Sequence, residues 1–211
     1  MPNDADGLLM ENSLYSTKIG GSDYKGAERT EIVNTLVTAV KEKNVVSVEY
    51  RSAGKDEVKS FDLDPMGLIL HKRSIYLLAK RKDSDTPRCF KADRFNSVEL
   101  SEEKADIPDG FSCEEFMHGS FGVFTPEDNE YEVKVRFSKA VSGTVLESVW
   151  HKTQEETVLA DGEVELSFRL RGLAEVKTWI LSWGPCAQVL APMELVSMVQ
   201  EDLRKCLQQY G

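Results

Sequence analysis

The chain has 211 residues, of which 41% are hydrophobic and 29% charged, and its formal net charge is −10 at pH 7. This composition is typical of a globular protein with one large domain or two small ones. Such a negative charge argues against general nucleic-acid binding, which depends on neutralising phosphates. The apolar runs are much shorter than the roughly 18 residues that span a membrane, and no signal peptide is present, so we expect a cytoplasmic protein.

The charge is unevenly distributed along the chain. Residues 46–100 contain 11 Lys and Arg against 9 Asp and Glu, whereas the rest of the chain contains 15 against 27. The first half is therefore slightly basic within an acidic protein. A binding site for an anion is expected there.

The residues that most often bind metals are scattered. The four cysteines form no C-x-x-C pair, so we expect reduced, mostly buried thiols rather than a zinc site or a disulfide framework. The three histidines lack ligand spacing, and no Walker loop, dinucleotide fingerprint or nucleophile elbow occurs. The sequence therefore predicts a protein without metal or cofactor that is not an enzyme.

The first predicted elements in chain order form a small domain over residues 28–105. Residues 1–27 lack periodicity and predict a flexible tail or linker. The apolar stripe of Ile32, Leu36 and Val40 predicts a helix from Glu28 to Lys43. The strands that follow are short and closely connected, and they cover residues 45–50, 58–64, 68–71, 72–81 and 88–100. One helix followed by such strands favours a small closed or partly closed β-barrel.

The second half has a different order of elements. An acidic stretch with Pro108 marks a domain boundary, and residues 106–124 form a connector with a short helix around 113–118. Residues 125–211 then form a second domain. Its predicted strands are 131–137, 157–160, 164–170 and 187–192, and its predicted helices are 139–150, 174–184 and 194–210. Apart from the last helix, this is the ferredoxin-like order, so the chain as a whole is predicted to be α+β.

Several motifs resemble the WYL-domain family, which is named for a Trp-Tyr-Leu strand. The corresponding residues here are Ile75-Tyr76-Leu77, so Ile occupies the Trp position. The second half is similar to the WCX extension that often follows a WYL domain. The other matching stretches are V-E-Y-R (48–51), D-P-M-G-L (64–68), R-C-F-K-A-D-R-F (88–95), V-W-H (149–151), A-D-G-E-V-E-L (160–166), W-I-L-S-W-G (179–184) and V-L-A-P-M-E-L (189–195), with Tyr210.

The resemblance implies a fold and a function. Family members are typically bacterial transcriptional regulators with an N-terminal helix-turn-helix, an Sm/SH3-like WYL barrel and the C-terminal extension. The barrel's basic pocket binds an effector, in some members nucleic acid or a nucleotide. Residues 1–27 are too short for the helix-turn-helix, so direct binding of duplex DNA is not expected. Phe61 also stands where the family often has Arg.

The candidate ligand-binding residues lie on or beside strands of the predicted barrel. They are Tyr50, Arg51, Tyr76, Arg88, Lys91 and Arg94. Guanidinium groups bind phosphate through paired hydrogen bonds, and tyrosine offers an aromatic face for a base. The alternative is that Arg94 pairs with an acid such as Asp93 and that Tyr76 is a core residue with a satisfied hydroxyl. The basic pairs at 72–73 and 80–81 are interpreted as solvated strand ends.

Two functions remain open from the sequence. The first is a sensor that binds an anionic small molecule or single-stranded nucleic acid, without a membrane partner. The second is a structural dimerisation module that binds no ligand. Trp179 and Trp183 lie four residues apart on a predicted helix and form either the core of the second domain or part of a homodimer surface.

Overall fold

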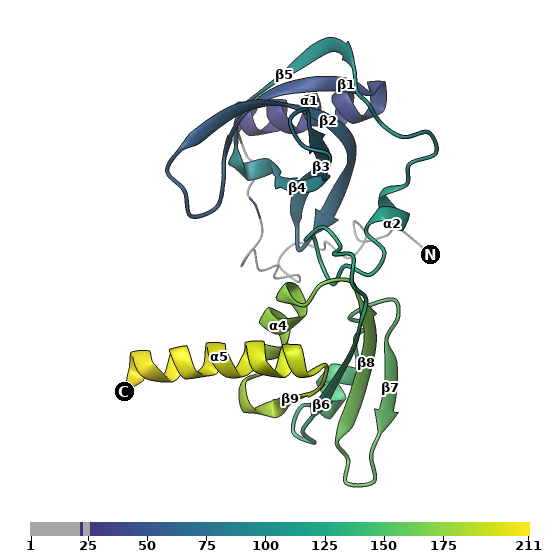
Figure 1. Ribbon diagram of the computed structural model, residues 1–211, viewed down its shortest axis with the longest axis vertical. Helices are drawn as coiled ribbons and strands as arrows, with labels where there is room; N and C mark the ends of the chain where they lie inside the picture. Colours follow the sequence, from purple (N-terminus) through teal and green to yellow (C-terminus); the bar gives the residue numbers. More distant parts are fainter. Residues whose placement is uncertain (1–21, 23–25) are drawn as a thin grey trace, which may run out of the picture.

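The computed structural model describes Ser22 and residues 26–211, so the predicted tail or linker at residues 1–27 falls almost entirely outside the described residues. Figure 1 shows two separate β-sheets, one in each half of the chain, joined by a connector that carries the short helix α2 (Cys113–Phe116). Both sheets are antiparallel and are accompanied by helices. The prediction of an α+β fold is confirmed.

The first half consists of the helix α1 (Ala27–Glu42) and a five-stranded sheet in the order β4-β3-β2-β1-β5. A single 3₁₀ turn, η2 (Ala92–Arg94), connects the two edge strands. The strands are β1 (Asn44–Arg51), β2 (Val58–His71), β3 (Ser74–Arg81), β4 (Arg88–Lys91) and β5 (Phe95–Lys104). Among the described residues no pairing joins β4 to β5, so closure into a barrel stays a prediction.

Strand β2 is continuous, although the sequence predicted two strands separated by Pro65 and Gly67. Residues 58–63 pair with β1, and residues 63–71 pair with β3. The register shifts between Pro65 and Gly67, which is where an irregularity accommodates a residue without an N–H donor. One long strand therefore pairs with both β1 and β3. Pro65 and Gly67 mark a bulge within this strand rather than a loop between two strands.

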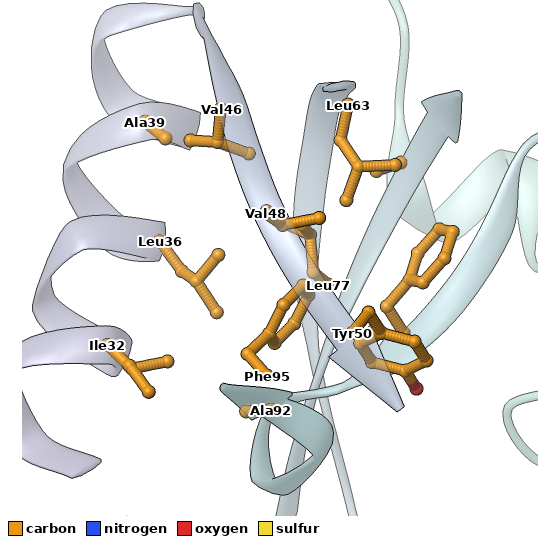
Figure 2. Packing of buried hydrophobic residues seen from close by; sticks show 12 residues of the cluster. Ile32, Leu36, Ala39, Val46, Val48, Tyr50, Leu63, Leu77, Ala92 and Phe95 are labelled. Carbon is orange, nitrogen blue, oxygen red and sulfur yellow. The ribbon is translucent and has the colours of Figure 1, made fainter. Parts of the chain in front are cut away.

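The core of the first half lies between α1 and the sheet (Figure 2). Ile32, Leu36 and Ala39 are buried, and Val40 packs against the same cluster, as the apolar stripe predicted. The sheet contributes Tyr50 and Phe95, whose ring centroids are 4.9 Å apart in an edge-to-face arrangement. This packing fixes the end of β1 relative to η2, where several candidate ligand residues lie.

The connector is held against β2 at two points. The buried Asp64 carboxylate accepts a hydrogen bond from the backbone N–H of Asp106 (2.9 Å) and pairs with Lys82 (3.1 Å). At Gly67, a Cβ atom would lie 1.9 Å from Sγ of Cys113, so only glycine permits this approach of α2. The D-P-M-G stretch therefore positions the connector as well as the strand.

The second half has the predicted ferredoxin-like arrangement. The sheet order is β7-β8-β6-β9, with every pair antiparallel. The elements are β6 (Tyr131–Phe137), α3 (Ser142–Leu146), β7 (Glu155–Val158), β8 (Val164–Leu170), α4 (Ala174–Leu181), η3 (Gly184–Cys186), β9 (Ala187–Ala191) and α5 (Met193–Tyr210). Trp179 and Trp183 pack against the core of this sheet, which confirms their interpretation as core residues.

Two expectations need correction. The helix predicted over 139–150 is only the short α3, because the chain leaves it before Trp150, whose Nε1–H donates to the Val145 carbonyl (2.9 Å). The four cysteines are free thiols as predicted, but they are not mostly buried. Three are half-buried and Cys206 is exposed near the end of α5. No helix within the described residues is long and apolar enough to span a membrane.

A matched pair of substitutions on α1 tests the first core. Leu36 is fully buried, whereas its neighbour Val37 is 46% exposed. Leu36→Ala should lower the free energy of unfolding by about 2–5 kcal/mol, because it leaves a cavity between α1 and the sheet. Val37→Ala should change it by less than about 0.5 kcal/mol. Urea unfolding of both variants measures the difference, and equal effects would contradict the packing described.

Candidate anion-binding site

A basic cavity of about 470 Å³ opens where α1, the β1–β2 hairpin loop and η2 meet. Its charged lining comprises four cations and two acids. These are Arg29, Arg51, Lys55 and Arg94, with Asp56 and Asp93. The site therefore has a local excess of positive charge in a chain of formal charge −10. Of the predicted ligand residues, the cavity brings together Arg51 and Arg94.

Both of these arginines are exposed, and neither forms an ion pair within the described part of the chain. The alternative partner for Arg94 was Asp93. That carboxylate instead lies 3.4 Å from Nζ of Lys91 and accepts a hydrogen bond from the Ser22 hydroxyl. Arg29 is anchored by a hydrogen bond from Nη1 to the Phe95 carbonyl (2.8 Å). The guanidinium groups of Arg51 and Arg94 therefore have no acidic partner among the described residues.

Tyr50 lies beneath this site rather than on its lining. It is buried in the core, and its hydroxyl accepts a hydrogen bond from the backbone N–H of Lys91 (3.1 Å). Burial raises the pKa of Tyr50, while its hydrogen bonds with the Arg94 side chain and the Lys91 backbone act in the opposite direction. The hydroxyl therefore joins the core to the arginine on η2.

Tyr76, Lys91 and Arg88 lie farther along β3 and β4. Tyr76 is half-buried and stands opposite Lys91 in the β3–β4 ladder. Alternation directs its neighbours Ile75 and Leu77 to the core cluster, as predicted, and leaves Tyr76 on the other face. Arg88 is exposed at the start of β4, without an ion pair among the described residues. None of the three lines the cavity.

The basic pairs at the two ends of β3 differ from each other. Lys72 and Arg73 form the β2–β3 turn with φ angles of 45° and 63°, where the sequence predicted a turn at Arg73-Ser74. Lys80 pairs with Asp106 (2.8 Å), and Arg81 bonds Asp83 while its guanidinium lies 4.2 Å from the Phe61 ring centroid. The second pair therefore forms surface ion pairs and a contact with the Phe61 ring, and it does not line the basic cavity.

Among the residues of the cavity that sequence reasoning missed are Arg29, Lys55 and Asn96. Lys55 could have been found, because it lies four residues after Arg51 in a predicted hairpin loop. Arg29 could not, because its place depends on the packing of α1 against β5 through the Phe95 carbonyl. The described residues contain no cluster of His, Cys, Asp and Glu that could hold a metal ion.

Two family models match the chain. The model of the WYL domain matches residues 31–100, and the model of the WCX domain matches residues 129–207. Both domains belong to regulatory proteins. The chain belongs to the WYL-domain family, as the motifs in its sequence indicated. No curated protein matches it significantly.

Several solved structures are similar to the chain, among them the following two. A CRISPR Cas-related protein has a TM-score of 0.56 and 10% sequence identity, over 86% of this chain and 52% of its own. Proteasome accessory factor B/C of Arthrobacter aurescens has a TM-score of 0.40 and 20% identity, over 90% of this chain and 29% of its own. The chain thus spans about half of the first protein and less than a third of the second. The first likeness supports a shared fold.

Removal of the Tyr50 hydroxyl tests the link between the core and Arg94. Tyr50→Phe should lower the free energy of unfolding by about 1 kcal/mol, because the Lys91 N–H loses its acceptor. Tyr131→Phe is the control, since that hydroxyl makes no hydrogen bond with any described residue, and it should have little effect.

The wild type and Tyr50→Phe should also differ in how their unfolding free energies depend on pH. Because the pKa of Tyr50 is raised above 10.0 in the folded state, its contribution to stability is constant below that pH. The contribution is lost as the pH rises through the pKa of the folded form. The unfolding free energy of the wild type should therefore fall more steeply above pH 10 than that of Tyr50→Phe. Parallel curves would contradict the assignment.

Proposed function

We propose that the chain is the ligand-sensing module of a cytoplasmic bacterial transcriptional regulator, and that an anionic effector binds in its basic cavity. The effector is a nucleotide or a short single-stranded nucleic acid. The observation that carries the proposal is the presence of Arg51 and Arg94 at one cavity, exposed and without ion pairs among the described residues. Membership of a family of regulatory domains supports the same function.

The proposed contacts follow from the chemistry of the lining. Arg51 and Arg94 would each donate paired hydrogen bonds to a phosphate, for which their planar groups are suited. Lys55 would add charge from the hairpin loop. Tyr50 would act from below by holding Arg94 in place. Binding would draw the loop, η2 and α1 together and favour one arrangement of the module over others.

The two kinds of effector would differ in whether they contact β4. A nucleotide needs only the cavity. A single strand would continue from it past Lys91 and Tyr76, where a base could lie against the tyrosine ring, and end near Arg88. The roles of these three residues are therefore proposed for an oligonucleotide only.

Calorimetry with a nucleoside triphosphate and with a short oligothymidylate tests this proposal. The Arg51→Ala/Arg94→Ala variant should bind either ligand at least about a hundredfold more weakly, because each charge-assisted hydrogen bond contributes about 1.5–3 kcal/mol. The affinity of the wild type should fall as salt is raised. Arg88→Ala should weaken binding of the oligonucleotide alone.

The control is Arg169→Ala/Arg204→Ala, which removes two exposed arginines of the second half that form no ion pair among the described residues. It should leave both affinities unchanged. The proposal fails if neither ligand shows salt-sensitive binding, or if the two double variants behave alike.

A second function, dimerisation, is favoured by the shape of α5. In Figure 1 the C-terminal half of this helix extends beyond the second sheet. It carries Leu203, Leu207 and Tyr210 at i, i+4 and i+7, with exposed fractions of 53%, 73% and 91%. Such a stripe on one face of a projecting helix is suited to a second copy of the chain. Dimerisation through α5 would bury this apolar stripe, and exposed apolar patches of this kind mark interaction surfaces.

Light scattering tests the dimer. The wild type should have the mass of two chains, and Leu203→Glu/Leu207→Glu should weaken association by at least about tenfold, because charges would face an apolar contact. Val149→Glu/Val158→Glu changes two other exposed apolar residues of the second half and should leave the mass unchanged. A wild type with the mass of one chain at every concentration rules out this surface.

A further inference from the structure

A second cavity lies between the two halves of the molecule. Its volume is about 460 Å³, which is in the range that holds small ligands. His71 and Lys72 line it from the β2–β3 turn, and Glu175 lines it from α4. Phe124 lines it from the connector. This interdomain cavity shares no residue with the basic cavity, so it constitutes a separate site.

The wall on the side of the second half is aromatic. The ring of Trp179 lies 5.1 Å from that of Trp150 and 5.2 Å from that of Phe121, centroid to centroid, and all three residues line the cavity. Phe124 is 61% exposed at the same place. Flat rings side by side offer a surface on which another ring can stack or meet edge to face. The wall therefore favours a planar, apolar ligand body.

The charges of the interdomain cavity balance each other. The Glu175 carboxylate is fixed, because its two oxygens accept hydrogen bonds from the backbone N–H groups of Val123 (2.9 Å) and Phe124 (3.0 Å). Lys72 is exposed on the opposite wall and forms no ion pair among the described residues. Burial, and then Lys72, lower the pKa of His71, while Glu175 acts in the opposite direction. His71 is therefore neutral at pH 7 and lies within the field of both charges.

We propose that the interdomain cavity binds a small planar aromatic molecule without net charge, either neutral or zwitterionic. Its ring lies against Trp150 and Trp179, and its polar groups face Lys72 and Glu175. A ligand with a single charge meets one favourable and one unfavourable partner, so it gains less. A ligand here touches both halves of the chain, and its binding favours the arrangement in which the β2–β3 turn faces α4.

A set of probes that share a phenyl ring tests the charge requirement. L-phenylalanine is a zwitterion, benzamide is neutral, phenethylamine is a cation and 3-phenylpropionate is an anion. All three tryptophans of the chain lie in its second half, and two of them line the cavity, so their fluorescence reports binding of probes that do not absorb at its excitation wavelength. L-phenylalanine and benzamide should give saturable changes in tryptophan fluorescence. The two charged probes should bind at least about tenfold more weakly.

Two variants locate the binding. Phe124→Ala removes an exposed ring and should weaken binding of every probe. Leu70→Ala changes an exposed apolar residue of β2 that does not line the cavity, and it should weaken binding of none. Lys72→Gly removes the charge, and glycine readily adopts the φ of 45° at this position. This variant should bind L-phenylalanine more weakly and benzamide with unchanged affinity. The proposal is overturned if no probe binds saturably, if a singly charged probe binds best, or if Phe124→Ala and Leu70→Ala behave alike. These results do not depend on the basic cavity, whose arginines are intact in every variant.

Discussion

The close approach of the connector to β2 is the constraint on which the rest of the structure depends. Gly67 makes room for Cys113, and three residues earlier the buried Asp64 carboxylate holds Asp106 and Lys82. A side chain at position 67, or loss of the carboxylate, would release the connector from the first sheet. Together with the hydrogen bond from the Thr125 hydroxyl to the Pro87 carbonyl, these contacts hold the connector against the first half. The D-P-M-G motif is thus an attachment point for the following domain.

The acids and the cations at the end of the first sheet away from the basic cavity are paired with one another. Asp64 and Glu103 pair with Lys82, Asp106 pairs with Lys80, and Asp83 pairs with Arg81. These contacts occupy the cations at the end of β3. The arginines at the hairpin loop and at η2 have no such partners among the described residues. Net charge therefore gave less information about binding than the pairing of individual charges.

The sequence predicted the elements better than it predicted the site. Strands β6 and β8 were placed at their observed bounds, because alternation of buried and exposed residues is a local property. Of the six candidate ligand residues, Arg51 and Arg94 line the basic cavity. Arg29 escaped notice because its place depends on a contact between α1 and residue 95, which no local pattern encodes. The sequence did not reveal the interdomain cavity for the same reason, since its walls come from four segments far apart in the chain.

Strand β2 connects the two cavities physically. The hairpin loop before Val58 lines the basic cavity, and the turn after His71 lines the interdomain cavity, so one strand of about 45 Å runs from one to the other. Its middle carries the bulge at Pro65 and the attachment of the connector. If a ligand at one end changes the position of this strand, affinity at the other end changes to the extent that the second ligand binds the two positions differently. Thermodynamic linkage then requires that the effect be equal in both directions. A sensor built in this way would respond to an anionic and an aromatic signal together, because both act on the same strand.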